Sequence, residues 1–149
     1  MHDNEFLDLA NIILYNSTMK IVADTSAFLA VVLEEPKKES IIKLTEGCDL
    51  IAPDVLPFEI GNALSSLLRK KVLKSGMAVK VWDAVIDIPV ELKPVDIRSA
   101  VAIADKHQIY AYDAYFLECA SHWRIPLLTL DRRLAKLAES IGIKVIEVP

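Results

Sequence analysis

The sequence predicts a single α/β domain in which helices cover both faces of a mainly parallel, twisted sheet of about five strands. Short apolar runs typical of buried strands alternate along the chain with longer segments of helical periodicity. The 149 residues are about the length of one domain, and a hydrophobic content of 53% is sufficient for a packed core. Alternating strands and helices favour parallel strands with helices on both faces.

Five segments are expected to be strands of this sheet. The first covers residues 20–24, where Ile21, Val22 and Ala23 form the continuous apolar run that suits a strand buried on both faces. The other expected strands are residues 50–52, 91–94, 126–130 and 144–148. A brief extended piece is also expected at 109–112, immediately before Asp113.

Helical periodicity and stop signals place the helices between these strands. Pro36, Gly47 and Gly142 mark helix ends, because proline disfavours helix before it and glycine is common after a last turn. The expected helices cover residues 27–33, 37–46, 56–73, 75–87, 96–107, 114–122 and 132–141.

The first part of the chain is expected to lie outside the main domain. We divide the sequence into an N-terminal extension, residues 1–18, and one domain, residues 19–149. Phe6, Leu9 and Ile13 recur at helical spacing, so the extension is either a short amphipathic helix or a frayed appendage.

Charge and cysteine content narrow the possible functions. The net charge is 17 − 21 = −4, which argues against non-specific coating of duplex nucleic acid but leaves room for a local basic groove. Cys48 and Cys119 form neither a disulfide framework nor a zinc motif, which fits a reducing cytoplasm.

No apolar run reaches the ~20 residues that span a bilayer, and the acidic N-terminus lacks the features of a secretory signal. We therefore expect a cytoplasmic protein without a membrane partner.

Four acidic residues fall at the ends of predicted strands or in the helices that follow. Asp24 and Asp131 close strands, Asp113 opens a helix, and Glu59 lies near the start of the long helix. Each aspartate alone is also a favoured helix N-cap, and Glu59 alone is a favoured first-turn acid. Ligands of such sheets bind at the carboxyl ends of the strands, where the four acids would meet. Carboxylates gathered there would repel unless a cation neutralised them, and oxygen ligands favour Mg²⁺ or Mn²⁺ over Zn²⁺.

The segments around these acids resemble the four acidic motifs of the PIN-domain ribonucleases, and most closely those of the VapC toxins of bacterial and archaeal toxin–antitoxin pairs. The resemblance covers residues 19 to about 148, and the added segment before the first acid is its main departure from the family. The matching segments are Val22-Ala-Asp-Thr-Ser-Ala27, Phe58-Glu-Ile-Gly-Asn-Ala63, Tyr112-Asp-Ala114 and Leu128-Thr-Leu-Asp-Arg-Arg-Leu134.

The resemblance implies a PIN-like three-layer α/β/α fold and a metal-dependent endoribonuclease that is the toxin of a type II toxin–antitoxin system. Asp24, Glu59, Asp113 and Asp131 would hold one or two Mg²⁺ or Mn²⁺ ions. Ser26 matches a hydroxyl expected to bond near the metal or a carboxylate, although an ordinary polar residue of the first helical turn is the other interpretation. The implied partners are an RNA substrate, a VapB-like antitoxin and a second copy of the chain in a homodimer.

Basic and aromatic residues near the acids are candidates for RNA contacts. Arg132 and Arg133 directly follow Asp131 and are expected to bind phosphate. A second basic cluster, at the end of the long helix, is equally a solvated helix face. Its residues are Arg69, Lys70, Lys71 and Lys74. Aromatic residues surround Asp113; most of them are expected to be core or interface residues, and one is a candidate for stacking on a base. These are Tyr110, Tyr112, Tyr115 and Phe116.

Asn62 and Thr129 lie close in sequence to Glu59 and Asp131. Asn62 either bonds a carboxylate or lies beside the apolar stripe, and Thr129 matches a hydroxyl that precedes the last acid. A phosphorelay receiver or haloacid-type phosphatase is disfavoured because Thr25 and Ser26 replace the second acid that these proteins need after the first strand. The main alternative is a PIN-like module that binds RNA or a partner without cutting.

Overall fold

A five-stranded parallel sheet forms the centre of the computed structural model, which describes residues 18–149. The strand order is β3-β2-β1-β4-β5, and every neighbouring pair is parallel. The strands are β1 (Lys20–Ala23), β2 (Asp49–Pro53), β3 (Glu91–Lys93), β4 (Leu127–Leu128) and β5 (Val145–Ile146). Strands β2 and β3 follow β1 toward one edge of the sheet, and β5 follows β4 toward the other edge. Strand order therefore reverses between the central strands β1 and β4.

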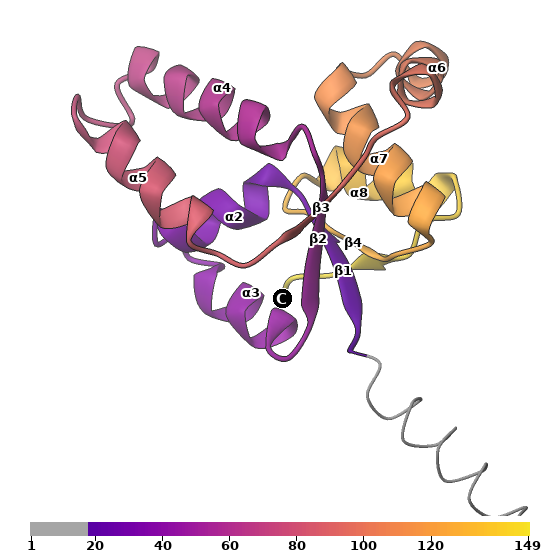
Figure 1. The fold of residues 1–149 in the computed structure, drawn as a ribbon, viewed down its shortest axis with the longest axis horizontal. Coiled ribbons are helices and arrows are strands. Elements are labelled where there is room, and N and C mark those ends of the chain that lie inside the picture. The colour runs from indigo at the N-terminus through magenta and orange to yellow at the C-terminus, as the bar shows by residue number, and fades with distance from the viewer. Residues whose placement is uncertain (1–17) are drawn as a thin grey trace, which may run out of the picture.

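Helices cover both faces of this sheet, which confirms the three-layer α/β/α prediction (Figure 1). One layer holds α2 (Thr25–Val32), α3 (Lys38–Thr45), α4 (Leu56–Arg69) and α5 (Met77–Ile86). The other holds α6 (Ile97–His107), α7 (Ala111–Trp123) and α8 (Arg132–Ser140). No helix of residues 18–149 is long and apolar enough to cross a membrane.

The core lies between the sheet and α7 on one face and between the sheet and α2 on the other. Ile21, Leu127 and Leu128 of the central strands are fully buried, as are Phe116 and Leu117 of α7. The continuous apolar run in β1 is therefore buried on both faces, as predicted, and Leu127 and Leu128 of β4 are buried in the same way. This packing fixes the carboxyl ends of β1 and β4 side by side.

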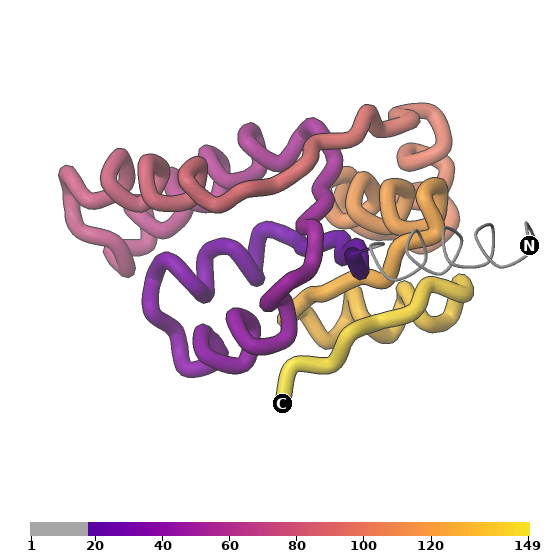
Figure 2. The backbone as a smooth tube through the Cα atoms, turned by 60° about the horizontal axis from the view of Figure 1, so that its bottom comes forward, coloured from indigo at the N-terminus to yellow at the C-terminus, as the bar shows by residue number. Residues whose placement is uncertain are grey.

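The last residues of the chain lie beside α3, which Figure 2 shows from a second direction. Lys37 Nζ donates a hydrogen bond to the backbone oxygen of Pro149 at 2.5 Å, and Ser40 Oγ donates to the same oxygen at 3.4 Å. The end of the described chain is thus held against the first helical layer.

Several helix starts differ by one to three residues from the sequence prediction, and two of them lie beside the acidic residues. Helix α2 begins at Thr25 rather than residue 27, because the Asp24 side chain caps it by accepting from the Ala27 N–H. Helix α7 begins at Ala111, so the expected extended piece at 109–112 is wrong. Short aromatic runs do not distinguish strand from helix by periodicity. Tyr110 has an extended backbone, at ψ 147°, but it pairs with no strand. The helix expected from Phe6, Leu9 and Ile13 lies outside the described residues.

Candidate active site

Asp24 lies at the carboxyl end of β1, next to the point where strand order reverses. Its side chain is 6% exposed. The Oδ1 atom accepts hydrogen bonds from Ser26 Oγ at 2.5 Å and from the Ala27 N–H at 3.2 Å, and Oδ2 accepts from Thr129 Oγ1. Asp24 is therefore both the N-cap of α2 and a buried carboxylate with a fixed orientation.

The two hydroxyls that bond Asp24 also join it to the end of β4. Ser26 Oγ accepts from the Leu130 N–H at 3.1 Å, and Thr129 Oγ1 accepts from the Asp131 N–H at 3.0 Å. Each hydroxyl proton is thereby directed toward Asp24. Ser26 takes the expected position beside a carboxylate, and Thr129, whose side chain is buried, is part of the same network.

Glu59 is held near Asp24 by a residue that sequence reasoning passed over. Glu59 lies in the first turn of α4, and its Oε2 accepts a hydrogen bond from Thr25 Oγ1 at 2.5 Å. Thr25 and Ser26 are neighbours at the start of α2, and successive helical residues point about 100° apart. One hydroxyl can therefore serve Glu59 while the next serves Asp24. A hydroxyl pair directly after a strand-end aspartate is the signal that could have identified Thr25.

Asp113 and Asp131 line one cavity of about 410 Å³ with Arg133. Asp113 is in the first turn of α7. Asp131 caps α8, because its Oδ1 accepts from the Arg133 N–H at 2.8 Å and the Leu134 N–H at 3.1 Å. The cap interpretation thus holds for Asp24 and Asp131 but not for Asp113, whose carboxylate caps no helix.

The pKa shifts of Asp24, Glu59 and Asp113 each include a contribution from the charge of at least one other of the four acids. Burial raises the pKa of Asp24 from 3.8 to about 6 and that of Glu59 from 4.5 to about 7. The charge of Asp113 adds to both increases, and the charge of Asp24 adds to that of Glu59. Burial also raises the pKa of Asp113, helped by the charge of Asp131 and opposed by Arg133.

Neutralising partners are missing from this acidic group. None of Asp24, Glu59, Asp113 or Asp131 forms a salt bridge with any residue of the range 18–149. The hydroxyls of Thr25, Ser26 and Thr129 stabilise charge on the carboxylates but carry none themselves. As the side chains are placed, no three carboxylate, imidazole or thiolate groups in the described chain are close enough to share one metal ion.

Of the other polar and basic residues that the sequence singled out, only some lie beside the four acids. Arg133 lines the cavity of Asp113 and Asp131, whereas Arg132 lines a different one of about 480 Å³ with Lys37, Thr129 and Lys136. Asn62 is exposed. Arg69 ends α4, about 15 Å of helix away from Glu59, so the basic cluster that begins there is remote from the acids.

His107 is a second residue that sequence reasoning missed. It ends α6 and lines the cavity of Asp113, Asp131 and Arg133, although the three histidines of the chain are widely spaced in sequence. The short connection between α6 and α7 brings it there. Only the path of the chain, and no local motif, could have indicated this position.

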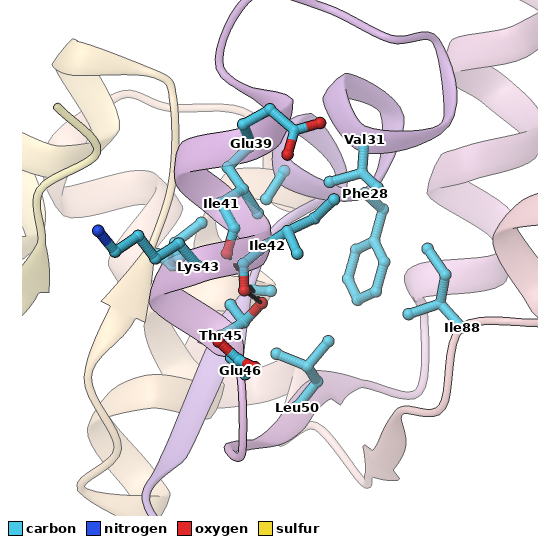
Figure 3. Close-up of a pocket in the computed structure, with 13 residues that line it drawn as sticks. Phe28, Val31, Glu39, Ile41, Ile42, Lys43, Thr45, Glu46, Leu50 and Ile88 are labelled. Atoms are coloured by element: carbon cyan, nitrogen blue, oxygen red, sulfur yellow. Dashed lines mark hydrogen bonds between the residues drawn. The ribbon is translucent and has the colours of Figure 1, made fainter.

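A larger cavity of about 570 Å³ lies between α2, α3 and β2, away from the four acids (Figure 3). Its walls are mainly apolar side chains such as Phe28, Ile42, Leu50 and Ile88. In the figure the ammonium group of Lys43 points away from this space. The cavity has no arrangement of polar groups suited to chemistry, so the acidic edge remains the candidate active site.

Comparison with known proteins identifies the family of the chain. The family model described as "PIN domain" matches residues 21–140. Ribonuclease VapC3 of Pyrobaculum aerophilum is 30% identical over 123 residues, which cover 79% of this chain and 94% of that protein.

Two solved structures resemble the fold. PAE2754 from Pyrobaculum aerophilum has a TM-score of 0.64 at 20% identity and covers 87% of this chain and 92% of that chain. FitAcB from Neisseria gonorrhoeae has a TM-score of 0.56 at 15% identity, with coverage of 85% and 96%. The chain belongs to the PIN-domain family and is a VapC-like member of it.

Proposed function

We propose that the protein is a Mg²⁺- or Mn²⁺-dependent endoribonuclease that acts in the cytoplasm as the toxin of a type II toxin–antitoxin pair. Its domain would be residues 19–149, and residues 1–18 would be an extension. Similarity to Ribonuclease VapC3 supports the reaction class. The proposed partners, a VapB-like antitoxin and a second copy of the chain, follow from the VapC resemblance.

One observation carries the proposal: the carboxylates at the sheet edge interact electrostatically, and none of them forms a salt bridge with any residue of the described range 18–149. Burying Asp24 and Glu59 as anions is unfavourable, since desolvation raises both pKa values. The donors are all hard oxygen atoms, which suit Mg²⁺ or Mn²⁺. The residues present therefore fit a divalent ion by charge and ligand type.

We assign Asp24, Glu59, Asp113 and Asp131 as the metal-holding carboxylates. When bound, a divalent ion lowers the pKa of a coordinated water and stabilises charge that develops on the phosphate. Ser26 and Thr129 fix the orientation of Asp24 through hydrogen bonds. Thr25 holds Glu59 in the same way. These hydroxyls would fix the orientation of Asp24 and Glu59, and the acidic side chains would then move closer together to share an ion.

Arg133 is the stronger of the two candidate RNA-binding arginines. It lines the cavity that contains Asp113 and Asp131, and its charge already lowers the pKa of Asp113. A phosphate bound beside the acids would therefore meet a guanidinium group. Arg132 would contact the strand farther along, because it lines the neighbouring cavity with Lys37 and Lys136.

The test is metal-dependent cleavage of single-stranded RNA by the full chain. The unaltered protein should cut in Mn²⁺ or Mg²⁺ and stop on addition of EDTA. Asp24→Asn and Asp113→Asn should each lose at least about 100-fold in rate, as is common when a group needed for transition-state stabilisation is removed. Asp83→Asn, which removes an exposed carboxylate of α5, is the matched control and should cut normally.

Equal cutting by the unaltered chain and both variants would reject the assignment of these acids. RNA binding that needs no metal, with no cleavage under any condition, would instead identify the non-enzymatic PIN-like module. Circular dichroism of each variant separates a chemical defect from a folding defect.

A further inference from the structure

The aromatic residues around Asp113 differ sharply in their exposure. Phe116 is fully buried in the core. Tyr112 and Tyr115 pack against each other edge to face, with ring centroids 5.9 Å apart and an interplanar angle of 89°. Tyr110 is 85% exposed. Of the four aromatic residues, therefore, Tyr110 alone has a ring largely free to receive a ligand.

Tyr110 also lies at the candidate active site. It lines the 410 Å³ cavity that holds Asp113, Asp131 and Arg133. Its backbone is fixed at the junction of α6 and α7, where its carbonyl oxygen accepts from the Ala114 N–H at 3.1 Å. The ring is thus attached to a rigid helix start beside the groups that would hold a phosphate.

We propose that Tyr110 is the platform on which an unpaired base of the RNA stacks, next to the phosphate held at Asp113 and Arg133. The proposal rests on the proposed nuclease function and adds a residue that would position the RNA for that reaction. Bases of single strands are free to stack on exposed aromatic rings, whereas bases in a duplex are occupied by their neighbours. Tyr110 would then place the adjoining phosphodiester at the acids, and it is a positioning residue for the reaction.

The test measures RNA binding separately from cleavage. An Asp24→Asn background prevents cutting, and a single-stranded RNA containing 2-aminopurine reports stacking by its fluorescence. Adding Tyr110→Ala should weaken binding about 5- to 150-fold, the range that one base–aromatic stack supports, and should abolish the fluorescence change. Tyr110→Phe keeps the ring and should bind within about twofold of the parent.

A matched control removes an aromatic ring elsewhere on the same helix. Trp123 is 41% exposed at the opposite end of α7, about 20 Å away by helical rise, and Trp123→Ala should leave RNA affinity unchanged. In the cleaving protein, Tyr110→Ala should raise KM for single-stranded RNA and leave any weak cutting of a duplex unaltered.

The outcomes separate the two proposals. If the unaltered chain cuts RNA but Tyr110→Ala binds and cuts like the parent, the stacking role is rejected and the nuclease function stands. If Tyr110→Phe is as defective as Tyr110→Ala, the hydroxyl rather than the ring is used, and stacking is again rejected. If the unaltered chain neither binds nor cuts RNA with metal present, both proposals fail together.

Discussion

Removing the charge of Asp24 is expected to stabilise the metal-free protein at neutral pH. Burial raises the pKa of Asp24 from 3.8 to about 6, so the folded chain holds this proton more tightly than the unfolded chain does. The contribution of Asp24 to stability is therefore fully present below about pH 4 and is lost as the pH rises to about 6. The rise from 3.8 to about 6 corresponds to about 3 kcal/mol of lost unfolding free energy.

The Asp24→Asn variant should avoid most of this loss of unfolding free energy, because an asparagine side chain can keep hydrogen bonds that Asp24 accepts. The asparagine Oδ1 can still accept from the Ala27 N–H and Ser26 Oγ, which both bond the same oxygen of Asp24. Its Nδ2 would donate to the second lone pair of Thr129 Oγ1. The Thr129 hydroxyl proton, which Asp24 Oδ2 accepts in the unaltered chain, would lose that acceptor, and this loss offsets part of the gain. Asp24→Asn should thus be up to about 3 kcal/mol more stable than the unaltered chain near pH 7.5 in EDTA.

Urea unfolding at about pH 4.5, 6 and 7.5 measures this difference, with circular dichroism as the signal. The two unfolding free energies should converge at the lowest pH and separate as the pH rises. Mn²⁺ should then stabilise the unaltered chain, by about 2.7 kcal/mol at a concentration 100 times its dissociation constant, and leave the variant unchanged. Asp83→Asn controls for loss of an exposed charge. Parallel pH profiles for Asp24→Asn and the unaltered chain would refute the argument that burial of this carboxylate opposes folding.

Three other changes test the remaining parts of the site. Thr25→Val removes the hydrogen bond to Glu59, so Mn²⁺ affinity measured by calorimetry should fall, and Thr25→Ser should restore it; an unchanged affinity would remove Thr25 from the site. Asp131→Ala should lose about 1 kcal/mol of stability with the helix cap, whereas Asp131→Ser should regain that stability in urea unfolding but not RNA cleavage. Arg133→Ala should raise KM, and it should lower the slope of RNA affinity against salt concentration by the equivalent of about one phosphate contact. Arg132→Ala should have a smaller effect on both quantities. Equal effects of the two variants would contradict a difference in role based on the different cavities that the two arginines line.

The sheet and the position of the acids could be predicted because both depend on short, strongly patterned segments. The apolar run before Asp24 has no polar residue to place on a solvent face, so it indicates a strand buried on both sides. Leu127 and Leu128 before Asp131 follow the same logic. In a parallel sheet, residues that follow the strands lie at the same edge, so the sequence predicts Asp24 and Asp131 at one edge. The structure adds that β1 and β4 are neighbours.

The start of α7 and the supporting groups could not be predicted because they depend on contacts between distant segments. Nothing local shows that Tyr110 stays extended while Ala111 begins a helix. The partnership of Thr25 with Glu59 joins α2 to α4, and the arrival of His107 in the acidic cavity depends on how α6 packs against α7. Side-chain hydroxyls are common at helix starts, so their choice of partner becomes clear only in three dimensions.

Capping and metal binding are compatible roles for Asp24 and Asp131, and their combination explains how the site can exist before an ion arrives. Each carboxylate accepts backbone N–H groups at the start of a helix, where the helix dipole favours negative charge. Glu59 and Asp113 lie in first turns, so they gain from the same dipoles although they cap nothing. Four helix N-termini thus supply partial positive charge to an edge that has no salt bridge among the described residues. The helix dipoles compensate the negative charge only in part, because the pKa values of Asp24 and Glu59 remain raised. We expect a divalent ion to bind here because it would neutralise the charge that is left uncompensated.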